Sequence, residues 1–339
     1  MKRPLSFRKS VFLPLFLALS LGFFGFARAS DEKESEPFNV SEVILEHVMD
    51  SHVWHVTDGL VIPLPVIVYS GEKGLDIFSS GNFFEHHKAV EYEGYKLDHN
   101  HIYLTDSGKA VLDFSITKNV LMLFINAGVL LFVLISVARA CRKNSGKAPS
   151  GLQSFIEPIV LFVKDEIVKP NIGPKYEKFL PYLLTLFFFI LFGNLLGLLP
   201  GAANLTGNIA VTMTLALFTF LITNFNGNKN YWKHILWTPG VPLPLRIIIF
   251  PVELIGIFTK PFSLMIRLFA AMTAGHIVLL SLVCLTFIFH NWFVGAGSSI
   301  FVLFISLIEL LVAGIQAYVF TLFSSLYIGL AVAEHEEDH

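Results

Sequence analysis

The chain has 339 residues, of which 54% are hydrophobic and 15% are charged, and its formal net charge is −2 at pH 7. The mean hydropathy of +0.66 excludes a disordered chain and argues against an ordinary soluble enzyme. The composition therefore predicts an integral membrane protein. Cys141 lies on a basic flank and Cys284 in an apolar run, so neither suggests a disulfide.

The first 29 residues have the pattern of a secretory signal peptide. Basic residues come first, an apolar run follows over residues 11–26, and Ala27-Arg28-Ala29 ends the segment. We predict cleavage after Ala29. The alternative is an uncleaved first span, but the apolar run is short for a hydrocarbon core of ~30 Å.

Residues 30–117 are predicted to form a small, acidic, extracytoplasmic domain of mixed or β structure. Sixteen acidic residues stand against five lysines here, and β-like runs occur at residues 60–69 and 110–116. Seven histidines lie in this region: His47, His52, His55, His86, His87, His99 and His101. The tight Cys/His spacings of a zinc site are missing, so a solvated acidic surface is favoured and a metal site is the alternative.

Residues 118–339 are predicted to form an all-α polytopic membrane domain with five transmembrane helices. The first span covers residues 120–138 and is followed by Arg139, Arg142 and Lys143. Because positive flanks stay in the cytoplasm, this span runs from outside to inside. Residues 151–170 have an apolar face and are predicted to lie as an amphipathic helix on the membrane surface.

Residues 179–228 fit a helical hairpin broken at Pro200-Gly201, and Lys229 follows its return leg. Both feet of the hairpin therefore belong in the cytoplasm. Two more spans follow, one to about His290 and one over residues 298–333, which leaves the C-terminus inside. About forty residues of helix reach about 60 Å, twice the hydrocarbon thickness, so these two helices are predicted to tilt steeply or bend.

Polar residues interrupt the two long helices. Arg267 is followed by a stretch from residue 268 to 308 without any Asp, Glu, Lys or Arg. A charge near the bilayer centre costs roughly 2.5–3.5 kcal/mol, so such a residue normally faces a protein interior or a wet cavity. Glu253, Lys260 and Arg267 are spaced by seven residues and share one stripe of the helix, whereas His276 lies on the opposite side.

On the final helix, Gln316 is predicted at the depth of Arg267, and Glu309 at the depth of His276. The arrangement suggests two offset half-paths for an ion, separated by a fixed positive charge. The pair of titratable groups would serve the outer half, and Glu253 would serve the inner entrance.

Each of these residues also has a structural interpretation. Arg267 could neutralise a buried carboxylate of the chain itself, and His276 could be a packed core residue. Gln316 and Asn194 could bond helix to helix. The candidates near the interface, Glu253 and Lys260, could extend their charged ends to the membrane surface.

Three segments resemble subunit a of the F-type ATP synthase. They are Ile-Arg-Leu-Phe through Ala-Gly-His at residues 266–276, Gly-Asn-Leu-Leu-Gly-Leu-Leu-Pro at residues 193–200, and the stretch from Glu309 to Gln316-Ala-Tyr-Val-Phe. The similarity covers roughly residues 151–339. It implies a non-catalytic subunit, without a cofactor, that serves ATP synthesis and hydrogen ion transport in the inner membrane of a bacterium. The implied partners are a ring of c subunits, the b subunits of the peripheral stalk, other ATP synthase subunits and lipid, but no nucleic acid.

The resemblance also implies roles for individual residues. Arg267 matches the essential arginine that faces the ring, with Gln316 beside it. Glu253 matches a position at the cytoplasmic half-channel, and His276 and Glu309 match a polar pair of the outer half-channel. Many relatives have Gly-Asn where residues 270–271 are Ala-Ala here, so one polar group is missing or supplied elsewhere. The resemblance assigns no role to the acidic domain.

The physical basis of this reading is the permanent charge of Arg267. A guanidinium stays protonated, so it holds an approaching carboxylate ionised while protons enter by His276 and Glu309 and leave beside Glu253. The sequence contains no Walker-type phosphate loop, so ATP chemistry belongs to other subunits. Sodium in place of protons stays open, because the ring carries most of the ion selectivity.

Two other classes of protein compete with this reading. A secondary transporter would bind an anionic substrate at the arginine, but no inverted repeat is evident. An intramembrane metalloenzyme would need clustered ligands, and no His-Glu-x-x-His run occurs.

Overall fold

A computed structural model describes residues 49–57, 60–71, 73–85, 88–98, 101–105, 108–144, 146–199, 201–236, 242–289 and 292–333. The predicted signal peptide, His47, His86, His87 and His99 lie outside the described residues. The chain divides into two compact units. The first comprises Met1–Leu121, Gly197–Ala203 and Ile277–Leu307, and the second comprises Met122–Leu196, Asn204–His276 and Ile308–His339.

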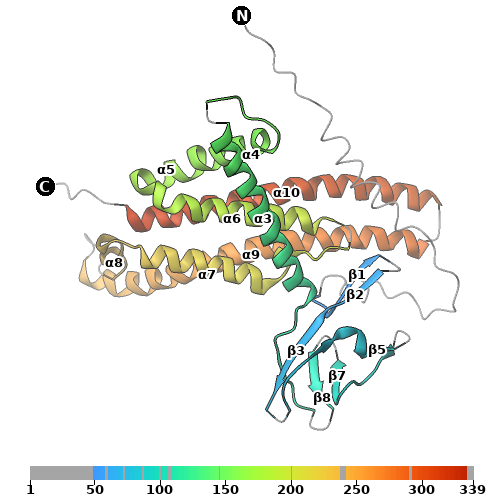
Figure 1. The fold of residues 1–339 in the computed structure, drawn as a ribbon. Helices are drawn as coiled ribbons and strands as arrows, with labels where there is room; N and C mark the ends of the chain where they lie inside the picture. Colours follow the sequence, from blue (N-terminus) through green and yellow to red (C-terminus); the bar gives the residue numbers. More distant parts are fainter. Residues whose placement is uncertain are drawn as a thin grey trace, which may run out of the picture. The chain divides into compact units, whose positions relative to one another are not determined.

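The N-terminal part of the first unit consists of short antiparallel strands (Figure 1). They are β1 (Val53–Thr57), β2 (Leu60–Pro63), β3 (Pro65–Ser70), β4 (Gly74–Ser79), β5 (Phe84–Glu85), β6 (Lys88–Ala89), β7 (Tyr95–Asp98), β8 (His101–Leu104) and β9 (Leu112–Asp113), with a 3-10 turn at Ser80–Phe83. The sheet β4-β3-β9 has three strands, and β1-β2, β5-β6 and β7-β8 form pairs. Val66 and Val68 of β3 are fully buried with Phe83 and Tyr95. The β-run predicted at residues 60–69 is confirmed by β2 and β3, whereas of residues 110–116 only Leu112–Asp113 form a strand.

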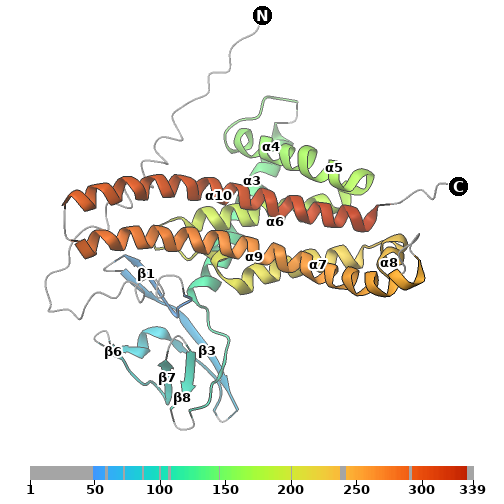
Figure 2. The same ribbon diagram turned by 180° about the vertical axis from the view of Figure 1, so that it is seen from behind.

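The rest of the described chain is helical (Figure 2). Its elements are α3 (Lys118–Lys143), α4 (Leu152–Phe162), a π-helical segment (Val163–Val168), α5 (Lys169–Ile172), a 3-10 turn (Gly173–Lys175), α6 (Tyr176–Gly197), a 3-10 turn (Leu205–Gly207), α7 (Ile209–Phe225), α8 (Lys229–Leu236), α9 (Leu243–Phe289) and α10 (Trp292–Val332).

Four helical stretches among the described residues are long and apolar enough to cross a membrane, and a fifth is added if α7 and α8, bent by 101°, count as one span. The described chain is mostly helical and its apolar helices are compatible with the predicted polytopic membrane protein, whereas five spans and their orientation stay predictions. The return leg of the hairpin counts as a span only together with α8, because α7 alone has 17 residues.

The helix predicted over residues 151–170 is present but not uniform. α4 passes into a π-helical segment before α5, and the break comes at Gly173, whose φ of 73° lies in the left-handed region. Ile156, Val163 and Ile167 are buried, whereas Phe155 is 56% exposed. One face therefore packs on the protein, and a second apolar face is left for lipid.

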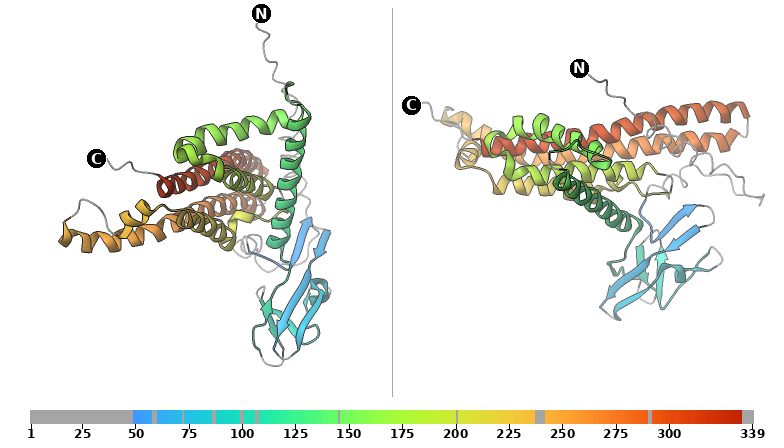
Figure 3. Two further views of the ribbon diagram at one scale, coloured as in Figure 1. Left: turned by 60° about the vertical axis from the view of Figure 1, so that its left-hand side comes forward. Right: turned by 45° about the horizontal axis from the view of Figure 1, so that its top comes forward.

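The two longest helices have 47 residues (α9) and 41 residues (α10), which correspond to about 70 Å and about 60 Å (Figure 3). Both exceed a hydrocarbon core of ~30 Å, as predicted from the sequence. Pro251 and Pro261 lie inside α9 without ending it. Such prolines are tolerated in membrane helices because neighbouring groups satisfy the freed carbonyls.

The core of the second unit joins α4, α6, α9 and α10. Leu183 and Phe188 of α6, Leu268 of α9 and Ile328 of α10 are all fully buried in one cluster. α10 approaches α5 so closely that a Cβ at Gly329 would overlap the carbonyl oxygen of Asn171. The outward faces are apolar as well, which is what lipid contact requires.

Candidate functional site

Glu309 of α10 is a buried carboxylate. It is 4% exposed, and neither Oε1 nor Oε2 has a hydrogen-bond partner within the described residues. It packs against Gly275 of α9, where an added Cβ would lie 3.0 Å from Oε1 and 3.1 Å from Cγ. His276, the next residue, is half-buried. Ionisable groups inside membrane segments commonly serve proton relays, so this is the part of the chain best suited to that task.

Arg267 lies on α9 and is half-buried. Its guanidinium carbon is 4.3 Å from the centroid of the Phe323 ring in α10, a cation–π contact. Nη1 is buried without a hydrogen-bond partner, and Arg267 forms no ion pair with any carboxylate in the described part of the chain. The alternative in which the chain neutralises its own arginine therefore finds no partner there.

The depth of Arg267 differs between its backbone and its charged group. Counted from the contact between Gly275 and Glu309, antiparallel helices place Ala317 opposite the backbone of Arg267, next to Gln316. The guanidinium, however, contacts the ring of Phe323, whose position in the sequence is six residues further along α10. Side chains on a helix point toward its N-terminus, which for Arg267 is the direction of Phe323 along the antiparallel α10.

The remaining members of the α9 stripe lie closer to its N-terminal end. Lys260 places Nζ 5.7 Å from the centroid of the Tyr327 ring, so it faces α10 as Arg267 does. Glu253 is half-buried, and its charge acts on Tyr231 of α8. Although these three residues are spaced by seven, they face two different helices. Lys260 and Arg267 face α10, and Glu253 faces α8.

Asn194 of α6 is fully buried and bonds across helices. Its Nδ2 donates to the carbonyl of Ala313 in α10 at 3.3 Å, and its Oδ1 accepts from Oγ1 of Thr206 at 2.6 Å. Ala313 is one helical turn from Glu309. Asn194 thus makes the interhelical contact that its structural interpretation predicted, and it makes it next to the buried carboxylate.

Two residues of this network escaped the sequence analysis. Asn204 accepts from the amide of Gly207 at 3.2 Å and donates Nδ2 to the carbonyl of Met272 in α9 at 3.4 Å. The Thr206 hydroxyl lies 3.3 Å from Oδ1 of Asn204. The signal was available, because Asn-Leu-Thr-Gly after a helix break is typical of a capped turn. What the sequence did not show is that the turn bonds to α9 directly and to α10 through Asn194.

In the first unit, His52 is a structural residue. It is 2% exposed, and its Nε2 lies 2.8 Å from Oδ2 of Asp113 in β9. Asp50, two residues before His52, contacts the start of α3, where its Oδ1 accepts a hydrogen bond from the amide of Asn119 at 3.1 Å. No group of three or more His, Cys, Asp or Glu side chains suited to a metal occurs among the residues that the structure describes.

This pair predicts a pH dependence of the strand domain. Burial alone would raise the pKa of Asp113, but hydrogen bonds from His52 and Ser115 outweigh burial and hold the pKa below its usual value of about 3.9. The stabilisation is therefore complete above about pH 4 and is lost as the pH falls through the lowered pKa. In the full chain, pepsin should cleave residues 49–117 faster at pH 3 than at pH 4.5.

The Asp113→Asn variant should be less stable by about 1–3 kcal/mol at pH 4.5, because it removes a charged hydrogen-bond acceptor. Its cleavage rate should change little between the two pH values. Glu91→Gln, at an exposed carboxylate, serves as the matched control and should keep the dependence of the original chain. An equally steep dependence in Asp113→Asn would refute the assignment.

Long apolar helices, two of them with buried or half-buried charged groups, define a polytopic membrane protein with ionisable groups inside its helical core. The family model of the ATP synthase A chain matches residues 120–329, and the chain belongs to this family. It is therefore a non-catalytic, membrane-embedded subunit, and the resemblance found in the sequence is confirmed. A domain of unknown function (DUF8433) matches residues 43–121.

Several ATP synthase subunits of bacteria are similar to the chain. ATP synthase subunit a 2 of Chlorobaculum tepidum is 52% identical over 238 residues, which cover 68% of this chain and 66% of that protein. ATP synthase subunit a 2 of Prosthecochloris aestuarii is 39% identical over an alignment that covers 99% of this chain and 98% of that protein. ATP synthase subunit a of Anaeromyxobacter sp. is 42% identical over 301 residues, which cover 84% of this chain and 71% of that protein.

Proposed function

We propose that the chain is the proton-translocating stator subunit of a rotary F-type ATP synthase, and that it provides two offset half-channels on either side of Arg267. The proposal rests on one observation, which is that Arg267 has no acidic partner among the described residues of the chain. It belongs to a membrane helix of an ATP synthase A chain, its Nη1 is buried without a hydrogen bond, and no described carboxylate of the chain pairs with it. A buried cation is costly without a partner, so an acid from another subunit is expected to supply one.

In this proposal the partner is a carboxylate on each subunit of a c-ring. Arg267 keeps that carboxylate ionised as it passes, because a guanidinium does not release its proton at physiological pH. The same charge repels a proton that would otherwise pass straight between the half-channels. The face of the Phe323 side chain contacts the guanidinium, which leaves the hydrogen-bonding edge of the guanidinium available to the c-ring.

The outer half-channel is proposed to run by His276 and Glu309. Glu309 is buried yet has oxygens that no described residue occupies, so it can accept a proton from water or from a neighbouring group. Asn194 bonds to Ala313, one helical turn from Glu309, and Thr206 bonds to Asn194, so both add polar atoms to an otherwise apolar region. With Asn204, they are our candidates for the polar group that Ala270 and Ala271 do not provide.

The inner half-channel is proposed to begin beside Glu253. One charge moved through 100 mV yields about 2.3 kcal/mol, so several protons are needed for each ATP. The proposed orientation follows from the basic end of α3, where Arg139, Arg142 and Lys143 belong on the cytoplasmic side. It puts the domain at residues 30–117 outside and the end of the membrane domain, residues 118–339, inside.

Purification of the assembled complex tests the proposed partners. We expect the chain to bring down a small hairpin protein with one carboxylate inside its membrane helices, together with the b subunits of a peripheral stalk. The matching measurement is ATP-driven acidification of vesicles that contain the complex, with and without sodium. Purification as a solitary chain that exchanges an anionic substrate would instead establish the secondary transporter.

A further inference from the structure

Two aromatic rings on neighbouring turns of α10 each receive a cation from α9. The ring centroids of Phe323 and Tyr327 are 6.0 Å apart, and the two planes meet at 40°. The guanidinium carbon of Arg267 lies 4.3 Å from the centroid of the Phe323 ring, and Nζ of Lys260 lies 5.7 Å from the centroid of the Tyr327 ring. Each cation therefore has a ring of its own.

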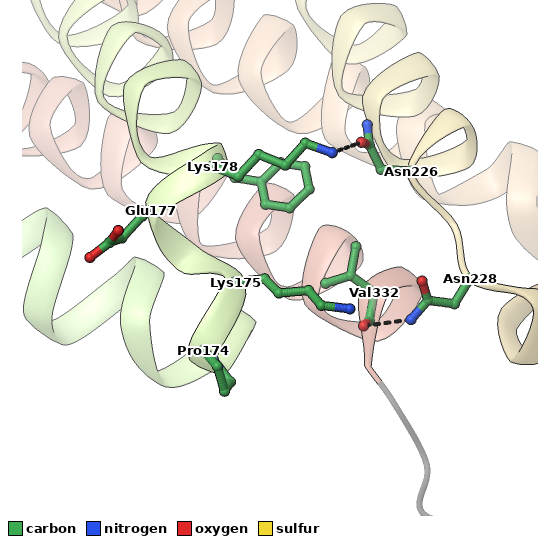
Figure 4. A pocket seen from close by; sticks show the side chains of 8 residues that line it. Pro174, Lys175, Glu177, Lys178, Asn226, Asn228 and Val332 are labelled. Atoms are coloured by element: carbon green, nitrogen blue, oxygen red, sulfur yellow. Dashed lines mark hydrogen bonds between the residues drawn. The ribbon is translucent and has the colours of Figure 1, made fainter.

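The part of α10 that carries these rings is held in place by polar contacts. Ser324 is fully buried, and its Oγ lies 3.3 Å from Oγ1 of Thr219 in α7. Figure 4 shows the end of the helix, where Nδ2 of Asn228 donates to the carbonyl of Val332 at 2.8 Å. These contacts fix the rotation and the position of the helix, so a cation that rests on one of its rings is fixed as well.

The face of an aromatic ring suits Arg267 because it attracts positive charge without occupying an N–H group. Ring faces carry negative electrostatic potential, and a planar guanidinium stacks on them. A carboxylate of the chain would attract the guanidinium too, but that bond would have to break before an acid from another subunit could bind. Arg267 forms no ion pair with a described carboxylate, so its N–H edge is not committed in this way.

We propose that Phe323 is a positioning residue that provides the resting contact of Arg267. This inference rests on the proposed function and deepens it. While no carboxylate of the c-ring lies opposite, the Phe323 ring holds the guanidinium at one place between the two half-channels. When a carboxylate arrives, it binds the N–H edge, and no bond within the chain has to break. The contact between Lys260 and Tyr327 takes no part in this step.

Stepwise fluorination of the Phe323 ring tests this inference. Fluorine withdraws electrons from the ring face and weakens its attraction for a cation, whereas the size of the ring changes little. The assembled complex is prepared in vesicles with one, two or three fluorine atoms on this ring. ATP-driven proton pumping should fall with each fluorine, by about tenfold for three. This factor corresponds to ~1.4 kcal/mol, which is within the range of cation–π contacts.

Two control positions on α10 separate the charge of the ring face from packing. Phe320 is 2% exposed and belongs to the core, and no described cation contacts its ring. Three fluorine atoms there should leave pumping unchanged. The same ring introduced at Tyr327 weakens a contact with Lys260 only, and most of the pumping should remain. Equal losses at Phe320 and Phe323, or no loss at Phe323, would overturn the inference.

Replacements by natural residues give a second readout. Phe323→Leu removes the ring and should lower pumping about tenfold, whereas Phe323→Tyr keeps a ring face and should pump like the original chain. Phe323→Glu should abolish pumping, because its carboxylate would compete with the c-ring for the guanidinium. Normal pumping by Phe323→Glu would contradict the resting contact, since an acid at this place would then not hinder the exchange of partners.

Arg267→Ala in the same vesicles separates failure of this inference from failure of the proposed function. If this variant does not pump and fluorination of Phe323 has no effect, the resting contact is wrong but the role of the arginine stands. If Arg267→Ala pumps normally, both the resting contact and the proposed function are wrong.

Discussion

Replacement of Arg267 by alanine is expected to abolish ATP-driven proton pumping while the complex still assembles. The reason is that no other described cation occupies the contact with Phe323. Two unit charges 4 Å apart interact by about 4 kcal/mol at an effective dielectric constant of 20, so loss of the pair changes the relevant equilibrium by about 1,000-fold. Pumping is measured as quenching of a pH-sensitive dye in vesicles.

The control for this experiment is Lys260→Ala, which removes the next cation along the same stripe of α9. Its Nζ lies over the Tyr327 ring, one contact further toward the N-terminal end of the helix. We expect this variant to keep most of the pumping, because a lysine near the interface can be replaced by water and mobile ions. Normal pumping by Arg267→Ala would remove the basis of the proposed function.

Replacement of Glu309 by glutamine is expected to reduce coupled and passive proton flux by about 100-fold, the usual contribution of a side chain that transfers protons. The amide has the size of the carboxylate and fits the contact with Gly275, but it cannot take up and release a proton. Passive flux is measured as the decay of an imposed pH difference, after the soluble sector of the complex has been removed.

Glu177→Gln is the matched control for Glu309→Gln, since it neutralises an exposed carboxylate at the start of α6. This control should leave both kinds of flux unchanged. If Glu309→Gln conducts like the original chain, the outer path does not pass through this residue. If only ATP-driven flux is lost, Glu309 acts on the ring and not on the entry of protons.

The sequence could predict much of the fold because lipid imposes a simple rule. Helices that cross a bilayer need about 20 apolar residues, so α3 and the hairpin were visible as uncharged runs, and the two long helices as apolar runs with few charged residues. The strands of the N-terminal domain were visible as short β-like runs between turn residues. The π-helical segment at Val163–Val168 was not foreseen, since such a segment has no clear sequence signature, whereas the break between α5 and α6 agrees with the separate ranges predicted for residues 151–170 and 179–228.

The candidate site was predictable only in part. A charge inside an apolar helix is conspicuous, which is how Arg267, His276 and Glu309 were selected. Polar residues in the turn after α6 are common in any loop, so Asn204 and Thr206 gave no reason to connect them with the long helices. His52 and Asp113, 61 positions apart, likewise became a pair only through the fold.

By itself the sequence determined that this protein is a membrane protein of the ATP synthase A chain family, because hydrophobic length, buried charge and motif are properties of the chain read in order. Tertiary structure decided which groups meet. It placed Glu309 against Gly275, brought the guanidinium of Arg267 into contact with Phe323 and joined Asn194 to α10 by a hydrogen bond. The reason is physical: residue spacing fixes height and angle on one helix, whereas contacts depend on how neighbouring helices pack and on where each side chain points.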